Sequence, residues 1–236
     1  MLRVLALCLP ALLLVTPATS DEGAFTVSLA GIRAGIIAFS GEETGGGRYT
    51  ARGSARSSGL VGSVLDISID TVAIGRVDGN TYRPSNYRQT GKEGDNVRDM
   101  KFTYRGGVPA VTRTPPRELP DHVARPANQA GTIDPTTTAF AMLRDRPRDL
   151  LCELNVDLYD GRRRANIRYT ELKSGRNGGF VCKGEYRREQ GFTPEELAER
   201  PFWPFSVIYT PLGNDLYRVA EVRVPTTFGP VRLRRR

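Results

Sequence analysis

The chain has 236 residues, of which 34 are lysine or arginine and 26 are aspartate or glutamate, for a formal net charge of +8. This length suits one β-rich domain or two small domains, and the basic excess favours anionic partners through long-range attraction. After residue 20, no apolar run of the chain approaches the length of roughly 20 residues that a membrane helix needs. This argues against a transmembrane segment in the mature protein.

Residues 1–20 have the pattern of a secretory signal peptide. Arg3 supplies the positive charge, the stretch from Val4 to Val15 is mostly apolar, and the small residues Ala18 and Ser20 stand three and one before the expected cut. We therefore expect cleavage after Ser20, export to the periplasm as a soluble protein, and no nucleic-acid partner in that compartment.

Short alternating segments separated by glycine and polar turns dominate the rest of the chain, which is typical of an antiparallel sandwich or barrel. The segment from Val64 to Ile74 shifts its apolar phase near Val72, as a strand with a bulge does. The other segments expected to form strands are 25–29, 36–39, 48–56, 81–82, 101–105, 156–159, 166–172, 180–187, 206–210, 217–224 and 231–235.

The segment between Val108 and Ile133 separates the earlier strands from the later ones. It carries five prolines and little periodicity, so we expect a long crossing segment or lid. The strands on its two sides have the same character. We therefore expect a single β-rich domain over residues 21–236, crossed by this proline-rich segment near 108–133.

Two segments depart from the β pattern and predict short helices. Asp134 can accept backbone N–H bonds as a helix cap, and Pro135 suits the first helical turn. Thr193 and Glu196 form a capping-box pattern, and Pro201 limits the helix that follows them.

Cys152 and Cys182 are the cysteines that remain after removal of the signal peptide. Cysteines in an oxidising compartment tend to pair, and closing this loop stabilises the fold by about 3 to 4 kcal/mol. A zinc site needs four ligands, and besides the two cysteines the chain has a single histidine, His122. A redox site usually places its two cysteines two residues apart, which these are not. We therefore expect a structural disulfide, no metal site and no cofactor.

The chain contains the segments DPTTTAFAMLR at 134–144 followed by Cys152, LYDGRRR at 158–164, CKGEYRR at 182–188 and LAGIRAG at 29–35. Together these segments resemble the signature region of the domain-of-unknown-function 3108 family. The resemblance implies a bacterial exported protein with a mainly β fold: a strongly curved antiparallel sheet, as a barrel or half-barrel, and no established reaction. Similar curved sheets in lipoprotein-carrier proteins hold acyl chains, which is an analogy of fold only.

Arg163 is a candidate for binding a ligand. Strand alternation places it on the same face as Ile167 and Tyr169, and an arginine that faces a core needs a carboxylate or an anionic ligand. An ion pair is the simpler hypothesis. The candidate carboxylates for it are Glu153, Asp157 and Glu185.

The aromatic cluster Phe202, Trp203 and Phe205 is the other candidate ligand-binding element, and it contains the only tryptophan. It either lines the mouth of an apolar site, since concave sites are rich in aromatic residues, or plugs one end of the barrel. A small barrel is usually filled by its own side chains, which favours the plug. The arginines of residues 232–236 suit either an anionic membrane surface or a charged edge strand that resists aggregation.

No catalytic constellation stands out in the chain. It contains no nucleophile elbow, no phosphate-binding glycine loop and no pair of zinc-binding histidines, and we expect His122 to lie in an exposed loop. We therefore expect a non-enzymatic periplasmic protein that binds a lipid or another apolar or amphiphilic envelope component in or beside the curved sheet. The alternatives are an envelope-integrity factor that acts on a periplasmic protein partner and, third, a hydrolase that uses His122.

Overall fold

A computed structural model of the protein describes residues 19–64 and 66–236. Residues 1–18, and with them most of the predicted signal peptide, lie outside these ranges, so export stays a prediction. Thr19 and Ser20 belong to the first strand. Within the described ranges no helix is both long enough and apolar enough to cross a bilayer.

The first half of the sheet is a meander of seven antiparallel strands. Each strand pairs with the next along the chain. The short helix α1 (Gly59–Val64) interrupts the meander between its third and fourth strands. The strands are β1 (Thr19–Leu29), β2 (Ile32–Thr44), β3 (Arg48–Ser57), β4 (Ile67–Asp78), β5 (Thr81–Glu93), β6 (Asn96–Arg105) and β7 (Val108–Thr114).

The second half of the fold begins within the proline-rich segment, after β7. Its last strand, β14, pairs with β1, so that both halves form one sheet. Its elements are η1 (Pro126–Asn128), α2 (Pro135–Leu143), β8 (Arg146–Pro147), η2 (Arg148–Leu150), β9 (Asn155–Tyr159), β10 (Arg164–Ser174), β11 (Phe180–Gln190), α3 (Pro194–Glu199), β12 (Phe202–Gly213), β13 (Leu216–Thr226) and β14 (Gly229–Arg235).

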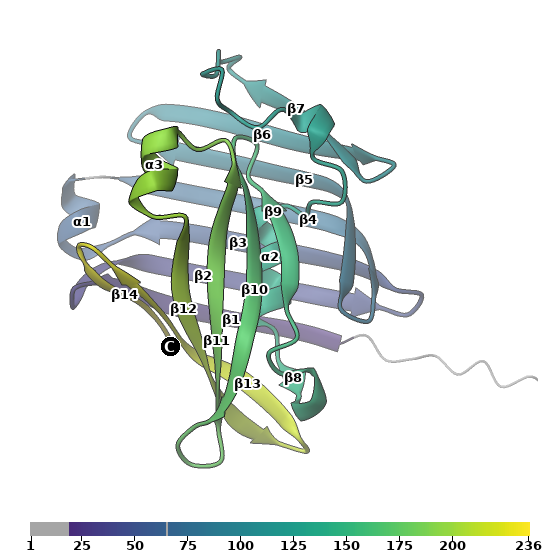
Figure 1. Cartoon of the computed structure of the whole chain (residues 1–236), viewed down its shortest axis with the longest axis vertical. Helices are drawn as coiled ribbons and strands as arrows, with labels where there is room; N and C mark the ends of the chain where they lie inside the picture. The colour runs from purple at the N-terminus through teal and green to yellow at the C-terminus, as the bar shows by residue number, and fades with distance from the viewer. Residues whose placement is uncertain (1–18, 65) are drawn as a thin grey trace, which may run out of the picture.

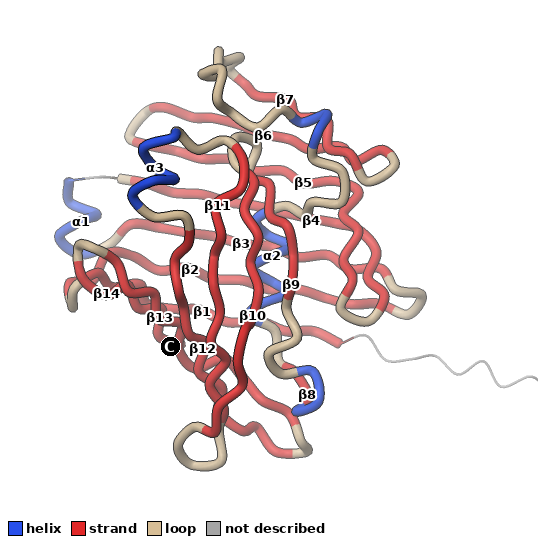
Figure 2. Tube along the Cα trace, viewed as in Figure 1, coloured by secondary structure: helices blue, strands red, loops and turns tan. Residues whose placement is uncertain are grey.

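The described strands form one strongly curved antiparallel sheet, as predicted. Its order is β7-β6-β5-β4-β3-β2-β1-β14-β13-β12-β11-β10-β9, with β8 beside β13. In Figure 1 the strands of the first half run across the view, whereas β9 to β12 run nearly vertically in front of them. Strands dominate the trace in Figure 2. The sheet is curved but not closed, since its path ends at β7 and β9.

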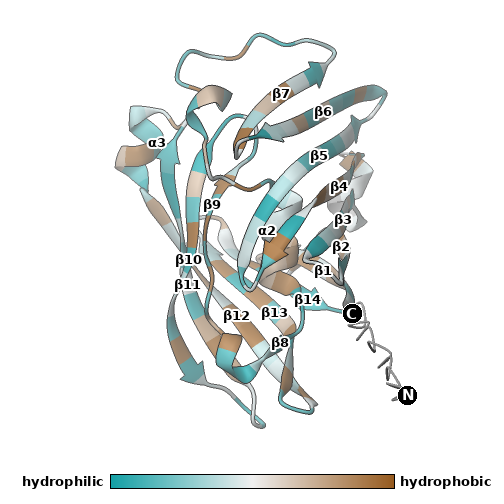
Figure 3. Ribbon diagram, turned by 90° about the vertical axis from the view of Figure 1, so that its right-hand side faces the viewer, coloured by the Kyte–Doolittle hydropathy of each residue, from teal (hydrophilic) through white to brown (hydrophobic). Residues whose placement is uncertain are grey.

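Helix α2 lies on the inner face of the sheet, between its two halves (Figure 3). The Thr136 hydroxyl is hydrogen-bonded to that of Thr71 on β4, and the Thr137 hydroxyl to that of Tyr49 on β3. Phe140 packs over Gly41 of β2, where a Cβ would lie 2.6 Å from the Cζ of Phe140. Glycine at this position therefore lets the helix approach the strand closely.

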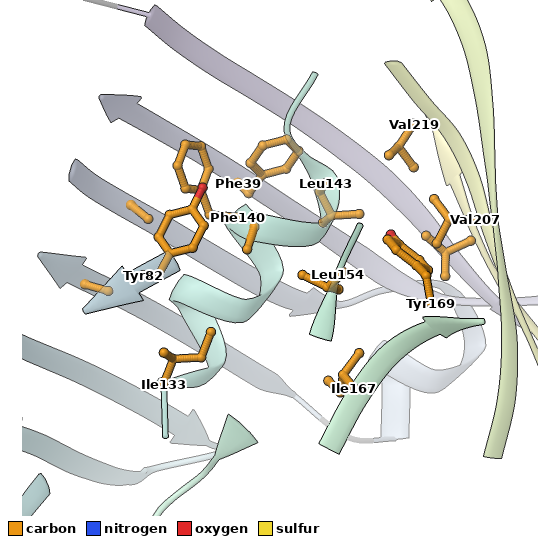
Figure 4. Packing of buried hydrophobic residues seen from close by; sticks show 14 of the residues in the cluster. Phe39, Tyr82, Ile133, Phe140, Leu143, Leu154, Ile167, Tyr169, Val207 and Val219 are labelled. Carbon is orange, nitrogen blue, oxygen red and sulfur yellow. The ribbon is translucent and has the colours of Figure 1, made fainter. Parts of the chain in front are cut away.

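The buried apolar core surrounds α2 on both sides (Figure 4). Phe39 and Tyr82 of the first half lie beside Phe140, and the rings of Tyr82 and Phe140 meet edge to face with centroids 6.3 Å apart. Leu154 and Tyr169 of the second half lie on the other side of the helix (Figure 4). The helix thus fills part of the space between the halves with its own side chains.

Both predicted helices form, with the predicted caps. The Asp134 carboxylate accepts the backbone N–H groups of Thr136 and Thr137 at 3.0 and 2.9 Å. At α3 the Thr193 hydroxyl accepts the N–H of Glu196, and the Glu196 carboxylate accepts the N–H of Thr193. These signals act between residues three apart or less, so the sequence alone reveals them.

Three local features differ from the sequence-based expectations. Residues 59–64 form α1, and β4 begins only at Ile67. The bulge expected near Val72 is a register shift between Ile74 and Gly75. The first part of the expected crossing segment forms the edge strand β7. Pro109 fits there because proline has no backbone N–H to donate to a neighbouring strand.

Cys152 and Cys182 lie at disulfide distance, with sulfurs 1.95 Å and Cα atoms 5.3 Å apart. Cys152 stands in the turn before β9, and Cys182 is fully buried in β11. Since β10 lies between β9 and β11 in the sheet, the pair joins the chain that leaves α2 to a strand farther along the sheet.

Candidate ligand-binding groove

An apolar pocket of about 320 Å³ lies on the inner face of the second half of the sheet. It begins at the end of α2 and continues over four neighbouring strands, β10 to β13. Its lining side chains are apolar apart from one tyrosine hydroxyl and one indole N–H. They are Met142, Ile167, Tyr186, Trp203, Phe205, Val222 and Val224.

Strand register places these side chains on one face. Ile167 of β10 is opposite Tyr186 of β11, which is opposite Trp203 of β12. Residues directly opposite each other share a face of an antiparallel pair, so the three side chains form a row across the sheet. Burial raises the pKa of Tyr186, so its hydroxyl stays protonated and can donate a hydrogen bond.

Gly184 shapes the wall of the pocket beside this row. It is opposite Phe205, and a Cβ at Gly184 would lie 2.7 Å from the Cε2 of Phe205. The Phe205 ring therefore lies flat over the glycine and meets Tyr169 edge to face, with centroids 5.8 Å apart. Phe205 is 6% exposed and acts as a fixed wall of the pocket.

The apolar surface continues from the pocket toward the first half of the sheet. Val222 and Val224 of β13 are opposite Leu233 and Val231 of β14, and Leu233 is opposite Val27 of β1. All except Val222 are half-buried. We call the pocket and these cross-strand neighbours the inner groove. Strands β12 and β13 both carry brown, hydrophobic stretches in Figure 3.

Arginines border the inner groove at its α3 end. The guanidinium carbons of Arg188 and Arg200 lie 5.9 and 4.3 Å from the centroid of the Trp203 ring. Arg188 also stacks on Phe192, at 5.3 Å. Toward α3, the side chains along the groove are thus first aliphatic, then aromatic at Trp203, and then cationic at Arg188 and Arg200.

Arg163 belongs to this end of the groove, but its partner differs from those expected. Its guanidinium donates to Glu196 of α3 at 2.7 Å and stacks on Phe192 at 4.8 Å. Asp157 instead pairs with Arg164, and Glu185 pairs with Arg168 and Arg187. The reason is that Arg163 precedes β10, so its side chain reaches α3 rather than the neighbouring strands.

The aromatic cluster divides between the two faces of β12. Trp203 and Phe205 line the inner groove, as a mouth for an apolar ligand requires. Phe202 lies on the other face, 41% exposed, where the guanidinium of Arg187 stacks on it at 5.5 Å. Alternation along a strand forces this division, so Phe202 is not part of the groove.

His122 is exposed in the loop before η1, as expected. Within residues 19–64 and 66–236 no group of three or more histidine, cysteine, aspartate or glutamate side chains is arranged to hold a metal ion. The inner groove therefore contains no assembled set of metal ligands among the described residues.

Sequence reasoning missed most of the groove residues. Met142, Ile167, Tyr186, Val222 and Val224 line it with Trp203 and Phe205, and Arg188 and Arg200 border it. Alternation within β12 and β13 is visible in the sequence, but both faces of these strands carry apolar residues. Only the position of α2 reveals which apolar surface stays uncovered.

Comparisons with known proteins place the chain in one family. The model of the family described as "Protein of unknown function (DUF3108)" matches residues 24–177. Among solved structures, the chain is similar to the crystal structure of a beta-barrel-like protein of domain of unknown function DUF1849 from Brucella abortus. That similarity has 12% sequence identity and a TM-score of 0.49, and covers 92% of this chain and 95% of that chain. None of the curated proteins matches this chain.

Proposed function

The chain belongs to the DUF3108 family, and from this premise we propose that the protein binds an apolar or amphiphilic component of the bacterial cell envelope in its inner groove. The predominantly apolar lining of the pocket carries this proposal. Concave sites of about 300 to 1,000 Å³ that are lined mainly by apolar and aromatic side chains are typical of small-molecule sites, and this pocket has a volume of about 320 Å³.

Burial energetics support a bound apolar ligand. Val27, Val224, Val231 and Leu233 are only half-buried on the inner face. Covering apolar surface contributes roughly 25 cal/mol per Å² to stability. A ligand that fills the groove is therefore stabilised by covering apolar side-chain surface that the protein alone leaves exposed. An acyl chain, which has no polar atoms to desolvate, suits such a lining.

The proposal includes a periplasmic location and no chemical reaction. The pattern of residues 1–20 supports export. The apolar character of the groove supports binding rather than bond cleavage, since catalysis needs polar groups directed at the reacting atoms.

Trp203 provides a direct test, because the only tryptophan of the chain lines the pocket. Titration of the purified protein with the neutral dye phenylnaphthylamine is expected to quench Trp203 and to enhance dye emission by energy transfer. The substitution Val224→Phe fills the pocket and is expected to weaken dye binding by about tenfold or more, equivalent to 1.4 kcal/mol or more.

The control for this experiment is Val97→Phe, which adds the same ring to an exposed position of β6. It is expected to bind the dye like the parent. Protein extracted gently from its native host is expected to carry an amphiphile that native mass spectrometry detects. Absence of both dye binding and a co-purified amphiphile would refute the proposal.

A depression on the outer face favours a second candidate function, an envelope-integrity factor that acts through protein contacts. This depression of about 690 Å³ is lined by Thr26 and Ser28 of β1 and by Arg232 and Arg234 of β14, among others. Within the described residues these two arginines form no salt bridge, and the Glu221 carboxylate that attracts both is paired with Arg223. They therefore suit an acidic protein partner. Cross-linking in the periplasm is expected to capture such a partner, and to lose it in the Arg232→Gln/Arg234→Gln variant. A partner that the variant retains, or none at all, counts against this function.

A further inference from the structure

We propose that the ligand of the inner groove is an anionic amphiphile whose head group binds Arg188 and Arg200 at the α3 end. This inference rests on the proposed function and adds the chemical class of the ligand. Its basis is the position of two cationic side chains at one end of an otherwise apolar groove. Neither forms a salt bridge among the described residues, and the Glu196 carboxylate, which attracts Arg188 at longer range, is paired with Arg163.

Strand register and a backbone hydrogen bond bring the two arginines to the groove. Arg188 follows Tyr186 by two residues on β11 and so lies on the same inner face. Its N–H donates to the carbonyl of Pro201 at 2.9 Å, which places residues 200–203 beside it. Helix α3 lies near the same ends of β11 and β12 (Figure 1).

Trp203 orients both guanidinium groups. Each lies over the indole ring, at 5.9 Å for Arg188 and 4.3 Å for Arg200. Stacking on an aromatic face uses the flat surface of a guanidinium and leaves its edge for hydrogen bonds. Arg188 uses one N–H of that edge for a backbone carbonyl, and its other N–H groups can donate to an anion. The same ring that lines the apolar pocket therefore also positions the cations.

The nearby carboxylates are already occupied by other groups. Glu196 accepts from Arg163 at 2.7 Å and from the N–H of Thr193 at 2.9 Å. Glu189 pairs with Arg164. Across residues 19–64 and 66–236, no carboxylate comes within 4.0 Å of the guanidinium of Arg188 or of Arg200. Arg188 instead donates to a neutral acceptor, the backbone carbonyl of Glu196.

These positions define the chemistry of the ligand. Its tail occupies the apolar pocket, whose volume of about 320 Å³ lies at the low end of the range for ligand sites and suits a single acyl chain. Its head is an anion, because charge-assisted hydrogen bonds from arginine to carboxylate or phosphate are about twice as strong as neutral ones. Both a fatty-acid carboxylate and a lysolipid phosphate have this chemistry.

The test compares ligands that share one acyl chain and differ in their head group. Quenching of Trp203 measures binding of the free fatty acid, lysophosphatidylglycerol, lysophosphatidylcholine and the uncharged monoacylglycerol, each below its micellar concentration. We expect at least one of the two anionic ligands to bind about tenfold more tightly than the zwitterionic and the uncharged ones. Which of the two it is distinguishes a carboxylate head from a phosphate head.

Variants assign this preference to the two arginines. In Arg188→Gln/Arg200→Gln we expect the preference for the anionic ligand to be lost while the uncharged ligand still binds. Arg188→Lys/Arg200→Lys retains the charges and is expected to keep part of the preference. The matched control, Arg83→Gln, changes an exposed arginine of β5 and is expected to keep all of it.

Two outcomes separate this inference from the function on which it rests. If the protein binds every ligand equally, or if the glutamine variant keeps the preference for the anion, the inference is wrong and the proposed function stands. If no acyl ligand binds the parent protein, the proposed function itself fails. The unfolding transition of each variant shows that the comparison is made on folded protein.

Discussion

Replacing Cys152 or Cys182 by serine is expected to lower the free energy of unfolding by about 3 to 4 kcal/mol under oxidising conditions. The pair is separated by 30 positions in the sequence, and a crosslink that closes a loop of this length restricts the unfolded chain by about that amount in the chain-entropy model. Urea unfolding followed by circular dichroism measures the change.

The double variant Cys152→Ser/Cys182→Ser is the control for this prediction. Either single substitution already removes the crosslink, so both are expected to lower the melting temperature similarly, and the double variant is expected to lose little more. Reducing agent is expected to destabilise the parent but none of the variants. A serine variant as stable as the oxidised parent would show that the pair does not clamp the second half of the sheet.

Replacing Asp134 by alanine is expected to lower the free energy of unfolding by about 2 to 4 kcal/mol near pH 5. Asp134 is fully buried. Its carboxylate accepts the N–H groups of Thr136 and Thr137 and the hydroxyl of Thr137, the last at 2.6 Å. Alanine leaves these groups without an acceptor in a place that water does not reach. Urea unfolding over a range of pH measures the loss.

The loss is expected to depend on pH, because burial raises the pKa of Asp134 to about 6 from its ordinary value near 4. Between these two values the folded protein binds a proton that the unfolded chain does not, so the stability of the parent relative to the variant grows as the pH falls. This contribution is fully present below about pH 4 and is lost as the pH rises through about 6.

Asp134→Asn is the matched control. Its amide oxygen can still accept the two N–H groups, and its amide nitrogen can donate to Thr137, but it carries no charge. We therefore expect it to approach the parent in stability near pH 4, to gain on the parent as the pH rises from about 4 to about 6, and to keep a constant advantage at higher pH. If the stability differences among parent, alanine and asparagine variants do not change with pH, the buried carboxyl does not titrate in this range.

The sequence reveals elements whose signals lie within a few residues. The cap at Asp134 and the capping box of Thr193 and Glu196 were predicted correctly because each involves backbone groups two or three residues away. Strands such as β2, β11 and β13 were predicted through alternation, although the structure extends them at one or both ends. Strand ends depend on pairing partners, which the local pattern does not contain.

Long-range pairings decided the features that the sequence left open. The partner of Arg163 is Glu196, 33 residues later, because α3 folds back over the start of β10. The strand β7 forms because β6 offers it an edge, despite prolines that favour a loop. The aromatic cluster splits between two faces only once β12 is fixed between β11 and β13.

By itself, the sequence determined the mainly β fold, the two capped helices, the resemblance to the DUF3108 family and the cysteine pair that the structure brings to bonding distance. Only the tertiary structure decided that β14 pairs with β1, that α2 fills part of the space between the halves, and that an apolar groove with an arginine border remains. The physical reason is distance along the chain: caps and alternation act over a few residues. A groove, by contrast, is the volume left after side chains from opposite ends of the chain, such as Phe25 and Arg235, have packed.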